Sequence, residues 1–471
     1  YDLVALTTGG GTVVNNDIIV ADNEVDTTAQ VCGVFYGRSV TNGIVRGNIG
    51  SGCGFDGGSR HIIEGNRFGG GVGSIQDQYS TDVVIRNNTC TTTTGWMIVV
   101  SIITRLTITG NILHQAGTSG YDAIRLFDIT DGVVAANTIT SAGRWGIQLT
   151  GFGSNTNINI VNNVFKGTAN TDILVVNVPC SRLVVANNTS NSSGASFIEV
   201  NSSATATDVT IKGNNITNLP GTAINAQSVT RLVVSGNSIR TVTSQSSIYL
   251  SNCAYYTVNG NTIDTAAQTG IFLSQSNDGT VNGNRIASCP VGIEVYYSDR
   301  ITVSGNRLSA ISNYAIYLIA GNYINISANS LVMNGAGLQG ISLNTNSTNC
   351  TITDNLISGA GTYGIYVPLQ CYPTLISGNH VISAGATGIY VNGCQDVVVG
   401  GNLVQNCGAG GIILTNGCTR ITCTGNESTG NVGGDGITCN SVSESVLSGN
   451  RCYNNSGWGI NEDAPSTENL I

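Results

Sequence analysis

A short motif recurs along almost the entire chain. It has the form apolar-x-apolar-x-Gly-Asn-x-apolar, as in LTITGNIL, VTIKGNNI and ITVSGNRL. Its Asn residues follow one another at a mean spacing of about 24 residues. They are Asn48, Asn66, Asn88, Asn111, Asn137, Asn163, Asn188, Asn214, Asn237, Asn261, Asn284, Asn306, Asn329, Asn355, Asn379, Asn402, Asn426 and Asn450. A unit this short cannot bury an apolar face alone, so neighbouring units must stack.

A second motif, Gly-Ile-x-apolar, lies between successive Asn residues, as in WGIQL, TGIFL and YGIYV. Each period thus holds at least two short β-branched segments of alternating polarity, separated by turn residues. These segments are too short for helices, and the Leu spacing of a leucine-rich repeat is missing. A propeller blade would need four strands in roughly 40 or more residues. We therefore predict an all-β fold, a single right-handed parallel β-helix of about 18 coils.

The composition agrees with this fold and argues against several functions. Gly occurs 62 times, charged residues make up 10% of the chain, and Lys stands only at Lys166 and Lys212. Strong helix formers are therefore scarce. The net charge of −9 argues against nucleic acid as a partner. No run of about 18 apolar residues occurs, so we expect no membrane span. The 3 His and 14 Cys residues lack the spacing of a zinc site, and we predict no metal site of that kind.

The predicted organisation of the chain is simple. Residues 1–42 are less regular and are expected to form an N-terminal cap, whereas residues 43–471 are expected to form the β-helix. The final residues, ENLI, look like the start of a further coil, so we expect the helix to continue or to be truncated there. An open end would expose strand edges and would need a cover.

The Gly-Asn-x-Ile and Gly-Ile-x-Leu motifs resemble the repeats of the pectin-lyase-like superfamily of right-handed parallel β-helices, from about Asn42 to the C-terminus. That superfamily includes polysaccharide lyases, glycoside hydrolases, mannuronan epimerases and bacteriophage tailspikes. The resemblance implies the fold, whereas motifs of corners and cores specify no activity. The run GFDGGSRH, residues 54–61, is faintly similar to an epimerase motif, but its spacing differs and it assigns no role.

Stacked coils place equivalent residues above one another, at a spacing of roughly 4.8 Å. The residue after the Ile of each Gly-Ile-x-Leu segment should point outward, and together these residues should form a column on one sheet. The predicted column is Gln76, Val99, Arg125, Gln148, Leu174, Glu199, Asn225, Tyr249, Phe272, Glu294, Tyr317, Ser342, Tyr366, Tyr390, Ile413 and Thr438. Polar and charged residues dominate its first half, and aromatic residues its second half.

The first half contains the densest gathering of charged and aromatic residues in the chain. Polysaccharide hydrolysis needs two carboxyl groups roughly 5 to 10 Å apart, and elimination needs a base beside a cationic group. The candidate catalytic residues are Asp77, Asp122, Arg125, Asp128 and Glu199. The candidate substrate contacts around them are Tyr121, Arg144, Trp145 and Gln148. The alternative is a set of exposed ion pairs with little effect on stability.

The aromatic second half suggests a platform for sugar rings, whose apolar faces pack against aromatic side chains. The candidate contacts are Tyr249, Phe272, Glu294, Tyr317, Tyr366 and Tyr390. A structural explanation is also open, because tyrosine ladders satisfy β-propensity and cross-strand pairing in any sheet. Cover by another subunit is a third explanation.

Three further sets have structural interpretations. Six arginines follow turn residues and are expected at a shared corner: Arg60, Arg105, Arg182, Arg231, Arg300 and Arg420. Three cysteines are expected to stack as buried thiols, with disulfides as the alternative; they are Cys371, Cys394 and Cys418. Four apolar residues at outward positions suggest a partner surface and allow a homotrimer; they are Val99, Leu174, Val176 and Ile413.

Together these features favour an extracellular β-helix, on a virion or cell surface, that engages a polysaccharide in the manner of a tailspike. If the charged cluster is catalytic, the enzyme would be a polysaccharide lyase or a glycoside hydrolase. One alternative is a non-catalytic structural or adhesive fibre, which the short, regular turns favour. A second alternative is a free-standing polysaccharide lyase or epimerase. The sequence requires no cofactor, although Asp residues would allow Ca²⁺ to assist such chemistry.

Overall fold

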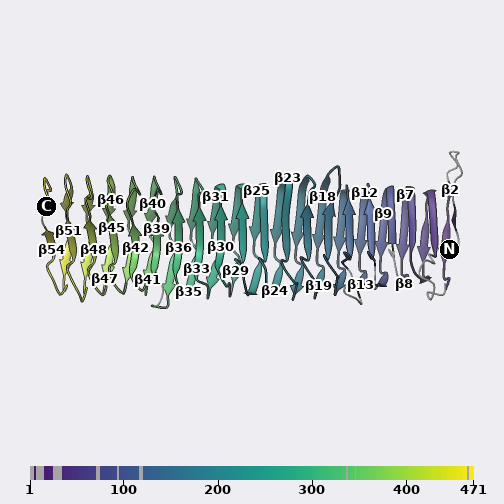
Figure 1. Cartoon of the computed structure of the whole chain (residues 1–471), viewed down its shortest axis with the longest axis horizontal. Coiled ribbons are helices and arrows are strands. Elements are labelled where there is room, and N and C mark those ends of the chain that lie inside the picture. Colours follow the sequence, from purple (N-terminus) through teal and green to yellow (C-terminus); the bar gives the residue numbers. More distant parts are fainter. Residues whose placement is uncertain are drawn as a thin grey trace. The chain divides into compact units, whose positions relative to one another are not determined.

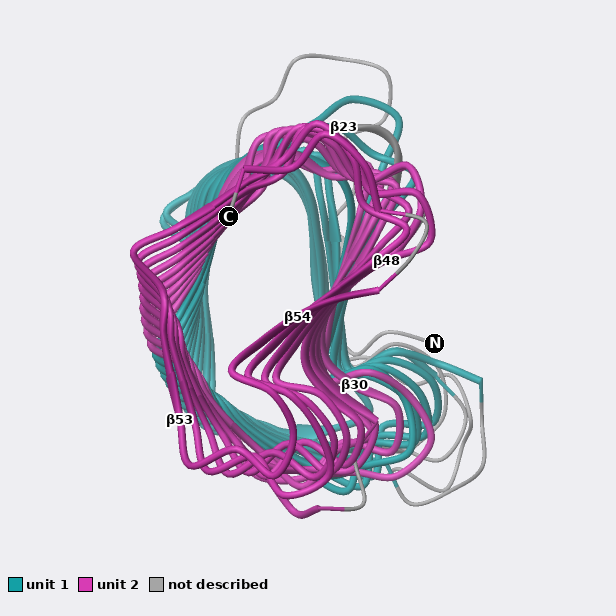
Figure 2. Cartoon of the chain, turned by 90° about the vertical axis from the view of Figure 1, so that its left-hand side faces the viewer, with its two compact units in different colours: residues 1–238 teal, residues 239–471 magenta. Residues whose placement is uncertain are grey.

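The computed structural model describes residues 5–6, 15–24, 34–70, 75–92, 95–115, 120–335, 338–344, 346–463 and 466–470. Within these ranges every regular element is a β-strand. The chain divides into two compact units, Tyr1–Ser238 (unit 1) and Ile239–Ile471 (unit 2), coloured separately in Figure 2. None of the described residues belongs to a helix that is long and apolar enough to cross a bilayer.

One coil of each unit illustrates the repeat. In unit 1 it consists of β14 (Ile124–Phe127), β15 (Thr130–Ala135) and β16 (Thr138–Thr140). In unit 2 it consists of β30 (Thr269–Ser274), β31 (Asn277–Asn282) and β32 (Arg285–Ala287). Each of these strands pairs in parallel with the equivalent strands of the adjacent coils in its own unit, as the stacked arrows of Figure 1 show. The predicted all-β parallel helix is thus confirmed.

The first strand of each coil starts at the Gly-Ile-x-Leu motif, and the first strands of successive coils form one series. In unit 1 this series is β9 (Ile75–Arg86), β11 (Ile98–Ser101), β14, β17 (Ile147–Thr150), β20 (Ile173–Val176), β23 (Ile198–Lys212) and β25 (Ile224–Ser235). In unit 2 it is β27 (Ile248–Ser251), β30, β33 (Val291–Tyr296), β36 (Tyr314–Ile319), β39 (Gln339–Leu343), β42 (Tyr363–Val367), β45 (Ile389–Asn392), β48 (Ile412–Thr415), β51 (Ile437–Asn440) and β54 (Ile460–Asp463). Viewed down the axis on which the coils stack, the outline of unit 2 bends inward where this series runs, at β30, β48 and β54 (Figure 2).

Alternation along each strand separates the core from the outer face. In β14, Ile124 and Leu126 are fully buried, and in β30 the same holds for Ile271 and Leu273. Because side chains of a strand alternate between its two faces, the residue between each pair points outward. Burial of one such aliphatic side chain contributes about 1.5–3 kcal/mol to folding. The repeated inward columns therefore stabilise each unit along its whole length.

The Asn residues of the Gly-Asn motif form a buried hydrogen-bonded ladder in each unit. In unit 1, the backbone N–H and the side-chain Nδ2 of Asn88 both donate to Oδ1 of Asn111, at 2.9 and 3.0 Å. In unit 2, Nδ2 of Asn284 donates to Oδ1 of Asn306 at 2.9 Å and to the Val258 carbonyl at 2.9 Å. Bonded partners lie 18 to 26 residues apart, the shortest separation being that between Asn48 and Asn66. The stacked Asn amides thus bond to one another from coil to coil within each unit.

The left-handed residue at each of these corners precedes the ladder Asn. Gly110 has a φ of +66° and Ala136 a φ of +53°, whereas the following Asn111 and Asn137 turn inward and are buried. The ladder Asn does not itself adopt the left-handed conformation. Its buried amide is needed for the ladder, so only its predecessor makes the turn.

The six predicted corner arginines do share one conformation. Their φ angles lie between 52° and 63°, and they are Arg60, Arg105, Arg182, Arg231, Arg300 and Arg420. Several pair with an acidic residue one coil away, as Arg105 does with Asp82 and Arg231 with Asp208. These pairs are exposed and contribute little to stability. The corner interpretation is confirmed.

The coils begin before the predicted boundary at residue 42. Strand β2 (Asn15–Asn16) pairs with β4 (Phe35–Thr41), and β3 (Ile19–Ala21) pairs with β5 (Ile44–Arg46). Asn23 Nδ2 donates to Asn48 Oδ1 at 2.9 Å, so the ladder also extends into this segment. The described part of residues 1–42 is therefore regular. Residues 1–4, 7–14 and 25–33, also assigned to the cap, lie outside the described residues.

The three predicted stacking cysteines are all buried and carry free thiols. Their thiols lie beside backbone carbonyls; Sγ of Cys394, for example, is 2.8 Å from the Pro368 carbonyl oxygen and Sγ of Cys371 is 3.0 Å from the Asn344 carbonyl oxygen. They pack as small apolar residues with weak donors, as predicted.

Candidate functional site

The predicted outward column is present in both units. In unit 1, Arg125 pairs in register with Val99 on one side and Gln148 on the other. In unit 2, Tyr317 pairs in register with Glu294 and Ser342. Leu174 of this column is only 5% exposed, so it does not belong to an exposed apolar patch as the sequence suggested.

A second outward column, which the sequence interpretation missed, runs three residues before the first. In unit 2, Gln339 pairs in register with Tyr314 and with Tyr363. The rings of Tyr314 and Tyr317 stack at 4.4 Å between centroids with an interplanar angle of 12°. Those of Tyr363 and Tyr366 stack at 5.2 Å and 14°. The repeated Tyr-x-x-Tyr spacing was the signal available in the sequence.

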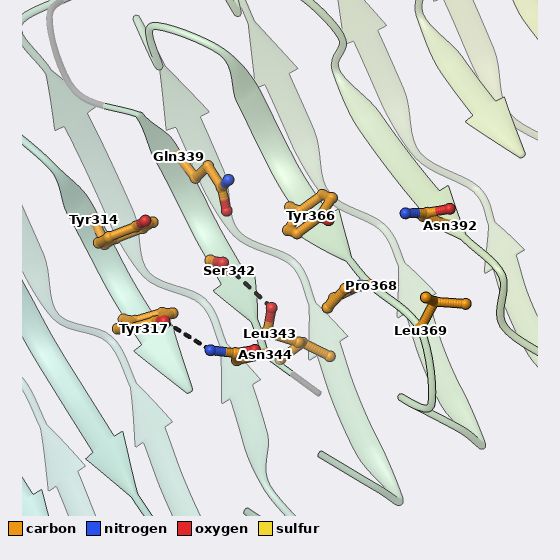
Figure 3. Close-up of a pocket in the computed structure, with 10 residues that line it drawn as sticks. All are labelled: Tyr314, Tyr317, Gln339, Ser342, Leu343, Asn344, Tyr366, Pro368, Leu369 and Asn392. Carbon is orange, nitrogen blue, oxygen red and sulfur yellow. Dashed lines mark hydrogen bonds between the residues drawn. The ribbon is translucent and has the colours of Figure 1, made fainter. Parts of the chain in front are cut away.

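A pocket opens where small and polar residues interrupt these aromatic columns. Ser342 lies between Tyr317 and Tyr366, and Gln339 lies between Tyr314 and Tyr363. The pocket has a volume of about 290 Å³. Figure 3 shows Tyr314 and Tyr317 on one side of Ser342 and Tyr366 on the other. The tyrosine pocket, as we call it, is lined by Tyr314, Tyr317, Gln339, Ser342, Leu343, Asn344, Tyr366, Pro368, Leu369 and Asn392.

The tyrosine pocket combines aromatic walls with neutral polar groups. Nδ2 of Asn344 donates to the Tyr317 hydroxyl oxygen at 2.8 Å, which fixes that ring (Figure 3). Oε1 of Gln339 is buried and accepts no hydrogen bond from the described residues. Burial raises the pKa of Tyr314, so its phenol is neutral at ordinary pH. Among the described residues, no charged side chain lines this pocket.

The other predicted aromatic residues extend the same face of unit 2. Tyr249 and Phe272 are in register, with ring centroids 5.3 Å apart. Tyr390 stacks on Tyr366 at 5.8 Å, and burial raises the pKa of its phenol as well. Glu294 accepts a hydrogen bond from the Thr269 hydroxyl at 3.2 Å, and burial raises the pKa of its carboxyl group. The structure thus brings the predicted aromatic set together.

In unit 1 the predicted charged cluster also forms around Asp122. This side chain is fully buried, and Arg144 binds both of its oxygens at 2.8 and 3.0 Å. Arg125 Nε lies 3.8 Å from the same carboxylate. Tyr121 contacts Trp96, which the sequence interpretation did not select, at 5.1 Å between ring centroids.

Trp145 and Gln148 complete this arginine cluster, defined here as Trp96, Tyr121, Asp122, Arg125, Arg144, Trp145 and Gln148. The Arg144 guanidinium lies over the Trp145 ring at 3.9 Å. Gln148 follows Arg125 in the outward column and is only 3% exposed. Six of these seven residues were predicted, because neighbouring coils place them together.

Three predicted catalytic carboxylates lie elsewhere. Asp77 points into the core, where its Oδ2 is 2.7 Å from His61 Nδ1, and burial raises its pKa. Asp128 occupies a left-handed corner and accepts backbone N–H groups of Phe152 and Gly153 at 3.2 and 2.8 Å. Glu199 is in the outward column, beyond Gln148 and Leu174. Within the described residues, none of these three carboxylates therefore lies beside Asp122.

The comparisons with known proteins identify the family. The model described as "Periplasmic copper-binding protein (NosD)" matches residues 7–177, 268–431 and 371–471, which is more than half of the chain. The model described as "Right handed beta helix region" matches residues 196–339. The fold and these matches define a right-handed parallel β-helix protein. The chain belongs to the NosD family.

Solved structures of similar fold are distant in sequence. DFA-IIIase from Arthrobacter chlorophenolicus A6 is 13% identical with a TM-score of 0.42, covering 60% of this chain and 84% of that one. The alginate lyase from Paenibacillus sp. str. FPU-7 is 13% identical with a TM-score of 0.35, covering 68% and 99%. The mannuronan C-5 epimerase AlgE4 A-module from Azotobacter vinelandii is 11% identical with a TM-score of 0.36, covering 68% and 90%. These values are too low to assign an activity. No curated protein matches the chain.

The family description names copper, and the described residues do not offer a donor set that fits it. No three His, Cys, Asp or Glu side chains in the described ranges lie close enough to share a metal ion. The three His residues lie on different coils, and each contacts another partner: His61 contacts Asp77, His114 contacts Thr140 and His380 contacts Gln405. We therefore derive no copper chemistry from them.

Proposed function

We propose that the protein binds a polysaccharide through the tyrosine pocket of unit 2. The observation that carries this proposal is the gap at Ser342 between the Tyr314–Tyr317 pair and the Tyr363–Tyr366 pair. An uninterrupted ladder of aromatic residues would be explained by sheet pairing alone. A gap flanked on both sides by stacked rings is a shape suited to a ligand.

The dimensions of the gap suit a sugar ring. Tyr317 and Tyr366 lie two coils apart, so their backbones are separated by roughly 9.6 Å, twice the spacing of neighbouring strands. One ring inserted above Ser342 would contact aromatic side chains on both of its faces. Gln339 and Asn392 line the same pocket and can form hydrogen bonds with hydroxyl groups at the rim of the sugar.

The absence of charge from the pocket lining indicates the class of sugar. The lining side chains are aromatic, aliphatic, amide and hydroxyl groups. Binding there would depend on stacking and neutral hydrogen bonds, so we propose a neutral glycan segment as the ligand. The proposal concerns binding and assigns no cleavage chemistry to this pocket.

The sequence also led to more specific predictions about location, assembly and Ca²⁺, and these are kept as part of the proposal. The family description includes the word periplasmic, which supports a location outside the cytoplasm. A virion or cell-surface role, a homotrimer and assistance by Ca²⁺ stay predictions.

Filling the gap tests the function. The substitution Ser342→Tyr would place a third aromatic ring between Tyr317 and Tyr366. We expect it to weaken binding at least tenfold in calorimetric titrations with cellotetraose, mannotetraose and maltotetraose, for whichever of these binds the unaltered protein. Thr438→Tyr is the matched control, because it adds the same side chain to the same column outside the pocket.

The outcomes separate the proposal from the structural alternative. Equal affinities of the Ser342→Tyr variant and the unaltered protein would place the ligand elsewhere. Failure of every neutral tetrasaccharide to bind would favour a structural or adhesive fibre.

A further inference from the structure

The arginine cluster of unit 1 holds more positive charge than its own carboxylate neutralises. Arg125 and Arg144 share the single carboxylate of Asp122. Arg144 occupies both oxygens of that carboxylate at hydrogen-bond distance. The 3.8 Å between Arg125 Nε and Asp122 Oδ2 is too long for a hydrogen bond. One positive charge is therefore in excess, in a chain whose net charge is −9.

Arg125 also has donors to offer. A guanidinium carries five N–H donors, and no hydrogen bond joins that of Arg125 to another described residue. Its Nε is buried without a partner. Burial lowers the pKa of Arg125, which means that its charge is poorly solvated where it stands. An anion at the outer side of this guanidinium would offset that cost.

Aromatic neighbours hold the guanidinium in place. The Cζ atom of Arg125 lies 5.3 Å from the Trp96 ring centroid and 4.6 Å from that of Phe127. Such cation–π contacts fix the orientation of a long side chain before a ligand arrives. The side chains of Arg125 and Arg144 remain 22% and 30% exposed, so both are accessible from solvent.

Two further polar atoms beside the arginines lack partners. Trp96 Nε1 is a buried donor and Gln148 Oε1 a buried acceptor, and neither forms a hydrogen bond with the described residues. Unsatisfied buried polar groups are uncommon in folded proteins and call for an explanation. Trp96 Nε1 and Arg125 Nε are donors that an acceptor group of a ligand can satisfy, whereas Gln148 Oε1 is an acceptor that needs a donor such as a hydroxyl group.

We propose that the arginine cluster of unit 1 is an oxyanion-binding site, taking a carboxylate or sulfate group that is either free or carried by a sugar. The planar fork of a guanidinium matches the two oxygens of such a group. Trp96 and Trp145 flank the arginines with apolar surface for the rest of an organic ligand. The proposal rests on unit 1 alone and does not depend on the tyrosine pocket.

Tryptophan fluorescence provides a local readout. The chain has three Trp residues, of which Trp96 and Trp145 lie in the cluster. In a Trp458→Phe background all Trp emission therefore comes from the cluster. We would titrate this protein with inorganic sulfate, D-glucuronate and D-glucose at constant ionic strength set with sodium chloride.

We expect a saturable change in emission with sulfate or glucuronate and none with glucose. Tighter binding of glucuronate than of sulfate by at least fivefold would identify a sugar acid as the ligand, and the reverse would identify the free oxyanion. Arg125→Gln should weaken the binding at least fivefold. Arg231→Gln, which removes an exposed corner arginine of the same unit, should leave it unchanged.

Two results would overturn the proposal. One is an equal response to glucose and glucuronate, or no saturable response to either oxyanion, in the protein with both arginines intact. The other is full affinity in a folded Arg125→Gln variant. Because the first comparison uses no cluster variant, it decides the question even if Arg125→Gln fails to fold.

Discussion

The outward columns of the two units differ, although the same backbone carries both. In unit 1 the column passes through Arg125, Gln148 and Glu199, whereas in unit 2 it passes through Phe272, Tyr317 and Tyr366. The inward columns of Ile, Leu and Val are alike in the two units. The repeat therefore determines the fold through its inward residues and leaves the outer position free to carry different chemistry.

The cores of the two units also differ in one buried acidic residue. Asp172 of unit 1 precedes β20, and it is buried with the Ser190 hydroxyl donating to its Oδ2 and no partner for its Oδ1. The equivalent residues before the strand Ile in unit 2 include Gly292 and Gly340, which do not titrate. The core of unit 1 should consequently respond to pH in a way that the core of unit 2 does not.

The largest expected effect tests this difference. Burial raises the pKa of Asp172 to about 7 from the ordinary 3.8. The protonated form is favoured in the fold, so stability is fully present below pH about 4 and declines as the pH rises to about 7. The shift corresponds to about 4 kcal/mol. Asp172→Asn should remove this decline, as measured by urea unfolding at pH 4 and pH 8.

The control for that prediction lies within the same chain. Hydrogen exchange at pH 8 should show stronger protection of unit 1 in the Asp172→Asn variant and unchanged protection of unit 2. Identical pH dependence of unfolding in the variant and the unaltered protein would contradict the assigned role of Asp172.

The Asn ladder should be equally important in both units. Asn137→Ala in unit 1 and Asn306→Ala in unit 2 each leave several buried donors and acceptors without partners. We expect each to lower the free energy of unfolding by about 2–4 kcal/mol. Asn440→Ala, an exposed position, should change it by less than about 0.5 kcal/mol. A small effect in only one unit would show that the inward columns are not equivalent.

The smallest effect concerns the corners. Arg231 pairs with Asp208 in unit 1, and Arg300 pairs with Asp278 in unit 2, each on an exposed corner. Replacing either arginine with Ala should cost less than about 1 kcal/mol, because water screens the pair. Denaturant midpoints of the two variants would check this, and a loss of several kcal/mol in either would refute the surface interpretation.

The sequence was informative wherever the repeat period governs the position of a residue. The register of Arg125 with Gln148, and of Tyr317 with Tyr366 across Ser342, follows from counting about 24 residues per coil. The grouping of Asp122 with Arg144 was predicted for the same reason. Periodicity fixes which residues are neighbours because each coil is built in the same way.

The sequence predictions were wrong where a residue's role depends on which way its side chain points and not on which residues are its neighbours. Asp77 follows the outward Gln76 and so must point inward, but it was assigned to the charged face. Asp128 lies at a corner, where its carboxylate caps the backbone of Phe152 and Gly153. Trp96 and Tyr314 were missed because the outer face carries two columns of side chains. Only the column formed by the residue after the Ile of each repeat motif was predicted from the sequence.

The gap at Ser342 is tested most directly by a crystal structure with a bound neutral oligosaccharide. We expect a sugar ring above Ser342, in contact with Tyr317 on one face and Tyr366 on the other. A sugar bound away from Ser342, or Tyr317 and Tyr366 closed against each other over it, would contradict binding at the tyrosine pocket.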